Sequence, residues 1–257
     1  MPFGISTSCI YPLNTEDSLS ELGKLGVKTA EVFLNSISET SAEFANCLNK
    51  IKDEYGMRIT AVHPFSSFSE TYMLFGEYKR RFYDVFDFYR RCFEFTAAVG
   101  ADVSIIHGSL LTGKISEEEY FERFSSLVEA GKEFGVRVAQ ENVNRHFSES
   151  PGFLRKLKAV LGEDFSLVFD VKQAVRAGYS PIEFAEEFKK DIVHIHVSDH
   201  DADRDCIAPG KGIFDFRKLI SVMNSADYSG DYIVELYRES FYSYSDLADA
   251  LLYLQSL

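Results

Sequence analysis

The sequence predicts an α/β fold: a (β/α)8 TIM barrel, a closed sheet of eight parallel strands, formed by residues 1–257 as a single domain. Strand-like and helix-like segments alternate along the whole chain, which is typical of parallel strands joined by right-handed helical crossovers. The length of 257 residues and a hydrophobic content of 46% suit one large domain of this class. Six strand-like segments also end on a side chain that could bind a metal, and a barrel would bring such ends to one mouth.

The first half of the chain contains four strand–helix units. The predicted strands cover residues 3–6, 29–34, 58–62 and 102–106. The predicted helices run over about 14–25, 41–55, 77–99 and 116–134. The last of them starts at Ser116-Glu117-Glu118-Glu119, which fits a capping box. A glycine stands where each helix should stop, as a left-handed C-terminal residue requires: Gly26, Gly56, Gly100 and Gly135.

The second half repeats this alternation and completes eight units. Its predicted strands cover 137–140, 166–169, 192–197 and 231–234, and its helices start at Pro151 or cover 181–189, 215–225 and 245–254. An open, doubly wound sheet is the structural rival. That fold would carry a glycine-rich phosphate-binding turn after the first strand, whereas Ser6-Thr7-Ser8-Cys9 stands there. The barrel is therefore favoured.

The loop at 64–76, after the third predicted strand, is long and rich in large apolar side chains, including Phe65, Phe68, Tyr72 and Phe75. Such a loop could be a lid over a ligand, or an irregular segment packed on its neighbours. Both interpretations stay open at this point.

Composition restricts the function classes. The formal net charge is −13, and no Lys/Arg cluster exceeds short helical groups, which disfavours a nucleic-acid partner. No segment approaches the roughly 20 apolar residues of a membrane span, and no signal peptide is visible at the N-terminus. The four cysteines show no close pairing, so we expect a reduced, cytoplasmic protein.

Four strand ends predict a metal centre. Glu141, Asp170, His196 and Glu235 end the fifth to eighth predicted strands, so a barrel would place them side by side around its rim. Three carboxylates crowded together repel one another, and a divalent cation removes that cost. Three carboxylates and one imidazole suit Mn²⁺ or Zn²⁺, with Mg²⁺ as a further candidate.

Two further histidines could extend this centre. His63 and His107 end the third and fourth predicted strands, beside Glu141. They could hold a second ion about 3.5–4 Å from the first, with Glu141 as the bridge, or bind substrate. A strand-end histidine is also often a hydrogen-bonded rim residue. Deeper in the barrel, we interpret His194 as a satisfied core histidine, and Glu31 as an inward-pointing acid or a member of a structural ion pair.

The order of these residues resembles the xylose isomerase-like TIM-barrel superfamily, which includes sugar isomerases and epimerases, inosose dehydratases and endonuclease IV-like DNA-repair enzymes. The resemblance covers nearly the whole chain, and no single motif carries it. The segments that carry it are Ala139-Gln140-Glu141-Asn142, Phe169-Asp170, His194-Ile195-His196-Val197-Ser198-Asp199, Pro209-Gly210-Lys211-Gly212 with Asp215, and Glu235. The resemblance implies a barrel with a metal at Glu141, Asp170, His196 and Glu235.

Departures from the family pattern narrow the choice among the activities found in the family. Epimerases and endonuclease IV usually carry Asp-x-x-His at strand six, whereas this chain has Asp170-Val171-Lys172-Gln173. Endonuclease IV would also need an Asp-x-His pair after strand seven, where this chain has Asp203-Arg204-Asp205-Cys206. The ketose epimerases place an arginine six residues beyond the strand-seven histidine, and Ala202 stands there. The DNA-repair function is therefore disfavoured, and substrate identity does not carry over.

The leading hypothesis is a metal-dependent isomerase or epimerase of a small sugar, sugar phosphate or polyol, acting through a metal-stabilised enediolate. Glu141 and Glu235 would exchange the substrate proton, and His63, His107, Gln173 and Lys211 could orient hydroxyls or a phosphate. For Lys211, a solvated loop lysine is the favoured interpretation. One rival is a two-metal hydrolase or lyase of endonuclease IV-like type. Another is a catalytically silent sugar-binding barrel. Loose dimers and tetramers are common in such barrels, so a homo-oligomer also stays open.

Overall fold

The computed structural model describes residues 2–65 and 69–257. Eight parallel strands close into one barrel in the order in which they occur in the sequence, as predicted. They are β1 (Phe3–Ser6), β2 (Thr29–Phe33), β3 (Arg58–His63), β4 (Val103–Ile106), β5 (Arg137–Glu141), β6 (Leu167–Asp170), β7 (Ile192–Val197) and β8 (Asp231–Val234). Pairing of β1 with both β2 and β8 completes the ring.

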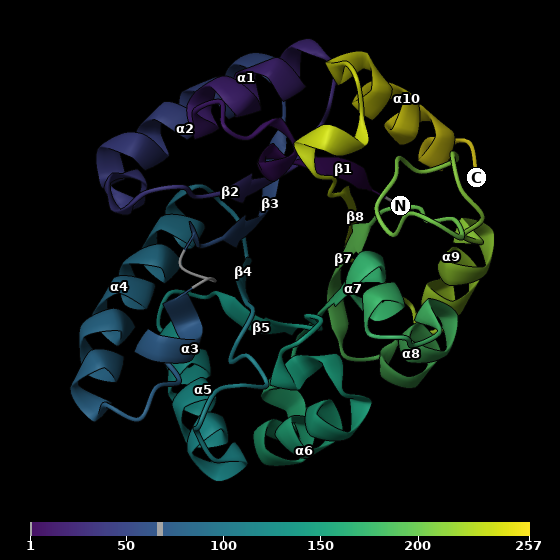
Figure 1. Ribbon diagram of the computed structural model, residues 1–257. Helices are drawn as coiled ribbons and strands as arrows, with labels where there is room; N and C mark the ends of the chain where they lie inside the picture. The colour runs from purple at the N-terminus through teal and green to yellow at the C-terminus, as the bar shows by residue number, and fades with distance from the viewer. Residues whose placement is uncertain (1, 66–68) are drawn as a thin grey trace.

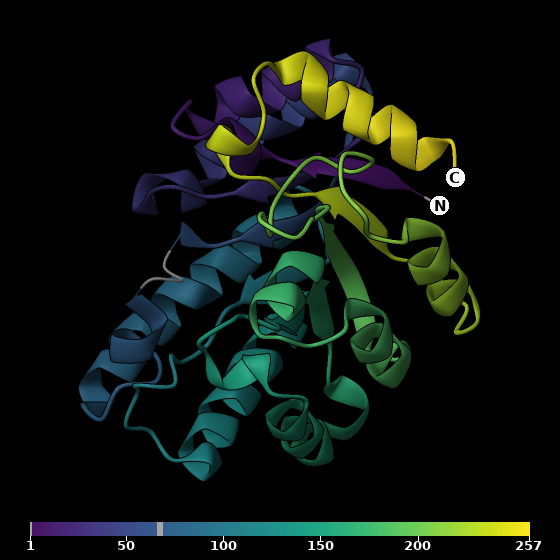
Figure 2. The same cartoon turned by 45° about the vertical axis from the view of Figure 1, so that its right-hand side comes forward.

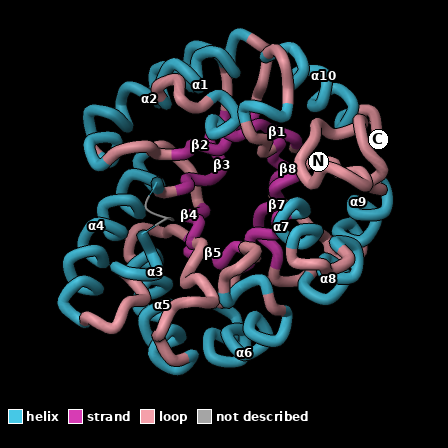
Figure 3. Tube along the Cα trace, in the orientation of Figure 1, coloured by secondary structure: helices cyan, strands magenta, loops and turns pink. Residues whose placement is uncertain are grey.

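Helices surround the strands on all sides (Figures 1 and 3). They are α1 (Thr15–Lys24), α2 (Ala42–Tyr55), α3 (Glu70–Met73), α4 (Lys79–Ala98), α5 (Glu117–Lys132), α6 (Pro151–Leu161), α7 (Val171–Arg176), α8 (Pro181–Phe188), α9 (Phe216–Asn224) and α10 (Tyr244–Gln255). In both views α10, at the C-terminal end, lies beside the N-terminal strand β1 (Figures 1 and 2). The first and last strand–helix units thus meet where the barrel closes.

Local sequence signals explain many of the element ends. Ser41 and Ser116 cap α2 and α5, each accepting a hydrogen bond from the backbone N–H three residues on. Gly56 follows α2 with φ of 59°, the left-handed conformation expected for a helix stop. The sequence patterns did not predict the short helices α3 and α7.

The described part of the loop after β3 packs onto the protein. Leu74 and Phe75 are fully buried, and the Phe75 ring stacks on Tyr120 at a centroid distance of 4.1 Å. Phe65 packs edge-to-face on Phe88 of α4. These contacts favour the packed segment over the lid for the described positions, while Phe68 lies outside the described residues.

The barrel interior is layered from floor to mouth. At the floor, Asp231 at the start of β8 accepts hydrogen bonds from Arg58 and Thr60 of β3. Above the floor lies a small apolar cluster formed by Ala61, Val103, Ile105, Ala139 and Val168. Such a filled interior is typical of TIM barrels and leaves the carboxyl ends of the strands as the place for chemistry. The larger apolar core lies between the strands and the surrounding helices.

No helix among the described residues combines the length and apolar character needed to cross a membrane.

Candidate metal centre

The structure brings the four predicted metal ligands together at the mouth of the barrel. Glu141 and Asp170 are the last residues of β5 and β6, His196 lies one residue before the end of β7, and Glu235 directly follows β8. Each offers one ligand atom, and these four atoms all lie within 4.8 Å of one another. The strand register accounts for part of this, because Asp170 is directly opposite His196 in the β6–β7 pair.

The His196 ring lies at the middle of the cluster. Its Nδ1 is 3.4 Å from Glu141 Oε1, 3.6 Å from Glu235 Oε2 and 3.8 Å from Asp170 Oδ2. Glu141, Asp170 and His196 are almost completely buried, and the Glu235 side chain is 15% exposed. The centre is therefore shielded below and opens to the mouth through Glu235.

Glu31 fixes the orientation of His196 from below. The fully buried Glu31 lies on β2, at a register shift between Ala30 and Glu31. Its Oε2 is 2.8 Å from His196 Nε2 and 2.9 Å from His194 Nε2, and its Oε1 accepts a hydrogen bond of 2.9 Å from Ser6. A carboxylate only accepts, so His196 donates from Nε2 and keeps the Nδ1 lone pair for the centre. This carboxylate–histidine arrangement is the usual support of a histidine metal ligand. Glu31 thus points into the barrel and also pairs with histidines.

The four residues fit a bound divalent cation. Two buried atoms that face the centre, Asp170 Oδ2 and His196 Nδ1, have no hydrogen-bond partner among the described residues. Glu141 turns its Oε1 toward His196 and its Oε2 toward His107. Leaving buried polar atoms unsatisfied is costly, and two that converge on one point among carboxylates indicate a ligand. Three carboxylates with one imidazole are a donor set for Mn²⁺, Zn²⁺ or Mg²⁺.

The pKa shifts of His196 and Glu141 reflect the charges packed into the cluster. Burial lowers the pKa of His196, but the charges of Glu31 and Glu235 outweigh burial and hold that pKa well above its usual range. Burial raises the pKa of Glu141, but His107 and the neighbouring imidazoles hold it well below the usual value. A site that attracts a proton this strongly also attracts a cation.

His63 and His107 form a second group with Glu141. The two Nε2 atoms are 2.7 Å apart, and His107 Nε2 is 2.8 Å from Glu141 Oε2. His63 Nδ1 lies 3.0 Å from the carbonyl oxygen of Pro64, so His63 donates there and its Nε2 accepts from His107. The single proton on His107 Nε2 can go to either His63 Nε2 or Glu141 Oε2, and the three residues are also close enough to share an ion.

Lys172 is a residue of this centre that the sequence patterns missed. Its Nζ lies 2.8 Å from Glu235 Oε2 and 3.2 Å from Asp170 Oδ2, and its side chain is 4% exposed. Burial lowers the pKa of this amine, yet Asp170 and Glu235 hold the pKa well above the usual value. It reaches the centre because Asp170 caps the short helix α7, accepting from the Gln173 N–H at 3.0 Å. The only sequence signal was a lysine two residues beyond a ligand at a strand end.

An inner cavity of about 340 Å³ lies over the centre. Its walls include His63, His107, Glu141, Lys172, Gln173 and Glu235, together with Phe33, Asn35 and Tyr237. Gln173 accepts a hydrogen bond from the Asn144 N–H through Oε1, which leaves its amide NH₂ for a ligand. Lys211, in contrast, is exposed in the loop after β7 and does not line this cavity. The structure thus brings Gln173 to the site and leaves Lys211 outside it.

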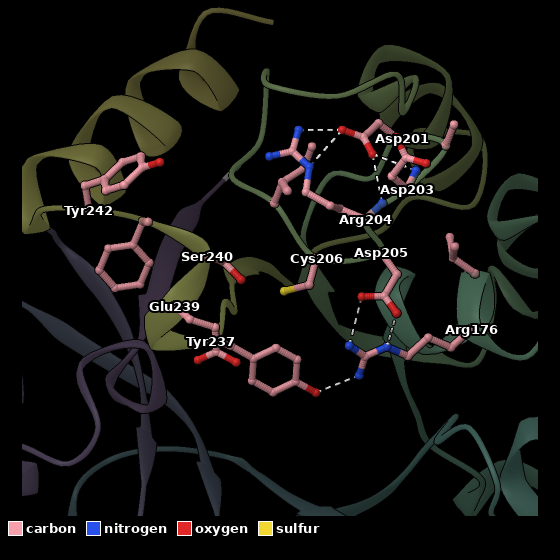
Figure 4. Close-up of a pocket in the computed structure, with 14 residues that line it drawn as sticks. Arg176, Asp201, Asp203, Arg204, Asp205, Cys206, Tyr237, Glu239, Ser240 and Tyr242 are labelled. Atoms are coloured by element: carbon pink, nitrogen blue, oxygen red, sulfur yellow. Dashed lines mark hydrogen bonds and ion pairs between the residues drawn. The ribbon is translucent and has the colours of Figure 1, made fainter.

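An outer cavity of about 630 Å³ adjoins the inner one, and Tyr237 lines both. Arg176 fixes the position of Tyr237, the residue shared by the two cavities. It pairs with both carboxylate oxygens of Asp205 at 2.6 and 2.9 Å and donates to the Tyr237 hydroxyl at 2.7 Å (Figure 4). The Tyr237 ring in turn lies 5.0 Å from Lys172 Nζ. A fixed series of side chains therefore connects the outer cavity with the buried lysine.

Fold and site together define a (β/α)8 barrel with a carboxylate–histidine centre at its carboxyl-terminal mouth. The model of the xylose isomerase-like TIM barrel family matches residues 19–257, so the chain belongs to that family. Both the resemblance and the fold class predicted from the sequence are therefore confirmed.

Solved structures of this fold cover nearly the whole chain. The 3-keto-D-glucoside 4-epimerase YcjR from E. coli has a TM-score of 0.82 at 14% identity and covers 100% of both chains. A D-psicose 3-epimerase has a TM-score of 0.81 at 15% identity, covering 100% of this chain and 97% of the other. A D-tagatose 3-epimerase-like protein has a TM-score of 0.79 at 19% identity, covering 100% and 99%. At these identities the likeness shows the shared fold.

A relative in sequence is the rhizopine catabolism protein MocC of Rhizobium meliloti, 26% identical over 136 residues. The match covers 46% of this chain and 42% of MocC, so the chain spans less than half of that relative's length.

Proposed function

We propose that this protein is a divalent-metal-dependent isomerase or epimerase of a small sugar or polyol. The observation that carries the proposal is the convergence of four buried or nearly buried ligand residues, with Asp170 Oδ2 and His196 Nδ1 unsatisfied among the described residues, next to a cavity lined by two acidic side chains, Glu141 and Glu235. The structural similarity to three proteins named as sugar epimerases or epimerase-like supports the same reaction class.

Glu141, Asp170, His196 and Glu235 would hold the cation. A cation bound there would withdraw charge from neighbouring substrate oxygens, acidify the adjacent C–H and stabilise the enediolate that forms on proton loss. Glu141 would take the carbon-bound proton and Glu235 would supply one, or the reverse, and the electron pair of the broken C–H bond stays in the enediolate until reprotonation. Both carboxylates line the inner cavity, so both can reach a sugar placed in it.

Residues around the cavity would position the substrate. The Gln173 amide can donate to sugar hydroxyls, and the His63 and His107 rings line the cavity beside it. Phe33 and Tyr237 offer apolar ring surfaces to the C–H faces of a sugar. Fixed groups of this kind hold reacting atoms in a productive orientation.

The charges around both cavities favour a neutral substrate over a sugar phosphate. Among the described residues that line them, the fixed positive charges are Lys172, Arg176 and Arg204. Each is already paired with carboxylates: Lys172 with Asp170 and Glu235, Arg176 with Asp205, and Arg204 with Asp201. Recognition of a phosphate uses free cationic or N–H donors, so a phosphorylated sugar would find none of these charges unpaired.

Proton exchange with solvent tests the proposed reaction. The Mn²⁺-loaded protein should incorporate deuterium at carbon into at least one of D-tagatose, D-psicose and D-fructose in D₂O, as measured by NMR. Glu141→Gln and Glu235→Gln should each reduce this exchange by at least about a hundredfold, because general acid–base catalysis contributes roughly 10²–10⁴-fold. Glu54→Gln, an exposed change on α2, is the matched control.

Full exchange in either active-site variant would remove that residue as an obligate base. Tight sugar binding without exchange across the panel would instead support a silent sugar-binding barrel.

A two-metal hydrolase is the second candidate, and the cluster of His63, His107 and Glu141 is the observation that favours it. Two Mn²⁺ or Zn²⁺ ions per chain after dialysis would support this function, and one ion would support the isomerase.

A further inference from the structure

Lys172 places its amino group inside the proposed metal centre. Its ammonium group contacts Asp170 Oδ2 and Glu235 Oε2, two of the oxygens that converge on the centre, and it is almost completely shielded from water. Even so, Asp170 Oδ2 accepts no hydrogen bond from residues 2–65 or 69–257. The lysine and a divalent cation would therefore share the same carboxylates.

A charge count at the centre follows from these contacts. Glu141, Asp170 and Glu235 face the centre with three negative charges, and Lys172 supplies one positive charge. Glu31 lies below and receives hydrogen bonds from Ser6 and from both histidines of β7. With the carboxylate of Glu31 included, three negative charges remain, which is fewer than the four positive charges of two divalent cations, and buried charges are stable only when they are compensated.

Lys172 is held in place and cannot easily turn away from an incoming cation. It lies in the first turn of α7, which Asp170 caps. Tyr237 covers its ammonium group, and Arg176 and Asp205 in turn hold Tyr237 (Figure 4). At an effective dielectric constant of about 20, charges separated by a few ångströms still interact strongly, so the fixed ammonium group repels a nearby cation.

We propose that Lys172 is a built-in cation that limits the centre to one divalent ion and lowers the affinity for that ion. The inference rests on the metal centre of the proposed function and deepens it. It predicts a site whose metal exchanges readily, and it disfavours the two-metal hydrolase.

Titration of metal-free protein with Mn²⁺ tests this inference without any turnover. Calorimetry should show one ion per wild-type chain, and Lys172→Met should bind Mn²⁺ at least about tenfold more tightly. Lys50→Met, on the exposed side of α2, makes the same change in net charge far from the centre and should match the wild type. Lys172→Gln provides a second variant of similar size if the methionine variant does not fold.

The outcomes separate the two proposals. Wild-type protein that binds no Mn²⁺, Zn²⁺ or Mg²⁺ contradicts the metal centre itself. Wild-type binding with unchanged or weaker affinity in folded Lys172 variants overturns the role of Lys172 and leaves the metal centre standing. Binding of two ions per wild-type chain also overturns the proposed role of Lys172.

Discussion

Glu31 acts on the centre through His196, without contacting the inner cavity. Its carboxylate accepts from both histidines of β7 and from Ser6, so it fixes the ring orientation of the one imidazole among the candidate ligands. Such supporting carboxylates contribute to metal affinity although they do not touch the metal.

Glu31→Gln should therefore weaken Mn²⁺ binding by roughly 10–100-fold, because an amide can donate as well as accept and no longer enforces the His196 tautomer. Calorimetric titration of metal-free protein measures the effect, with Glu54→Gln as the matched surface change. Unchanged affinity in a folded Glu31→Gln protein would show that β2 contributes only to the fold.

Some residues of the site could be predicted from the sequence and others could not. Strand ends identified Glu141, Asp170, His196 and Glu235, because each follows an apolar segment of strand length. Lys172 could not be found in this way, since its position depends on α7 starting directly at Asp170 and turning the side chain toward β8. Lys211 was a candidate for substrate contact, with a solvated loop lysine as the favoured interpretation, and the structure leaves it exposed.

At the scale of elements, the strands were predicted more accurately than the short helices. Three predicted strands have the observed bounds, and the other five differ by one residue at one or both ends, because apolar runs of strand length alternate with clear helix caps. Helices α3 and α7 are four and six residues long, too short to show a helical hydrophobic period. A local cap by Asp170 starts α7, and tertiary contacts hold α3, whose buried Glu70 binds Tyr89 and the Gly108 N–H.

The predicted cap of α5 gives an element-scale test of stability. Ser116 Oγ accepts from the Glu119 N–H at 3.2 Å, so Ser116→Ala should lower the free energy of unfolding by about 1 kcal/mol. Ser126→Ala, at a half-buried position within the same helix, removes only a bond to the Glu122 carbonyl and should lower the free energy of unfolding less. Urea unfolding monitored by circular dichroism compares the two. Equal losses would mean that the cap contributes nothing specific.

At the scale of the whole molecule, charge should select the substrate. The net charge is −13, and the fixed cations that line the two cavities are already paired. Fructose should therefore bind the metal-loaded protein at least about tenfold more tightly than fructose 6-phosphate, as measured by calorimetry at 0.15 M salt, where surface charges are partly screened. A preference for the phosphate would show that the loops rearrange to free Arg176 or Arg204.

The metal-type centre is built entirely on the barrel wall, from three strand residues and one that directly follows β8, while the outer cavity is formed by the segments around Asp201–Asp205 and Glu239–Tyr242. Under the proposed function, the residues that would hold the cation thus lie on the barrel wall, and the segments that enclose the outer cavity lie in the loops. Replacing those loop segments should change which molecule is admitted while the four candidate ligands stay in place.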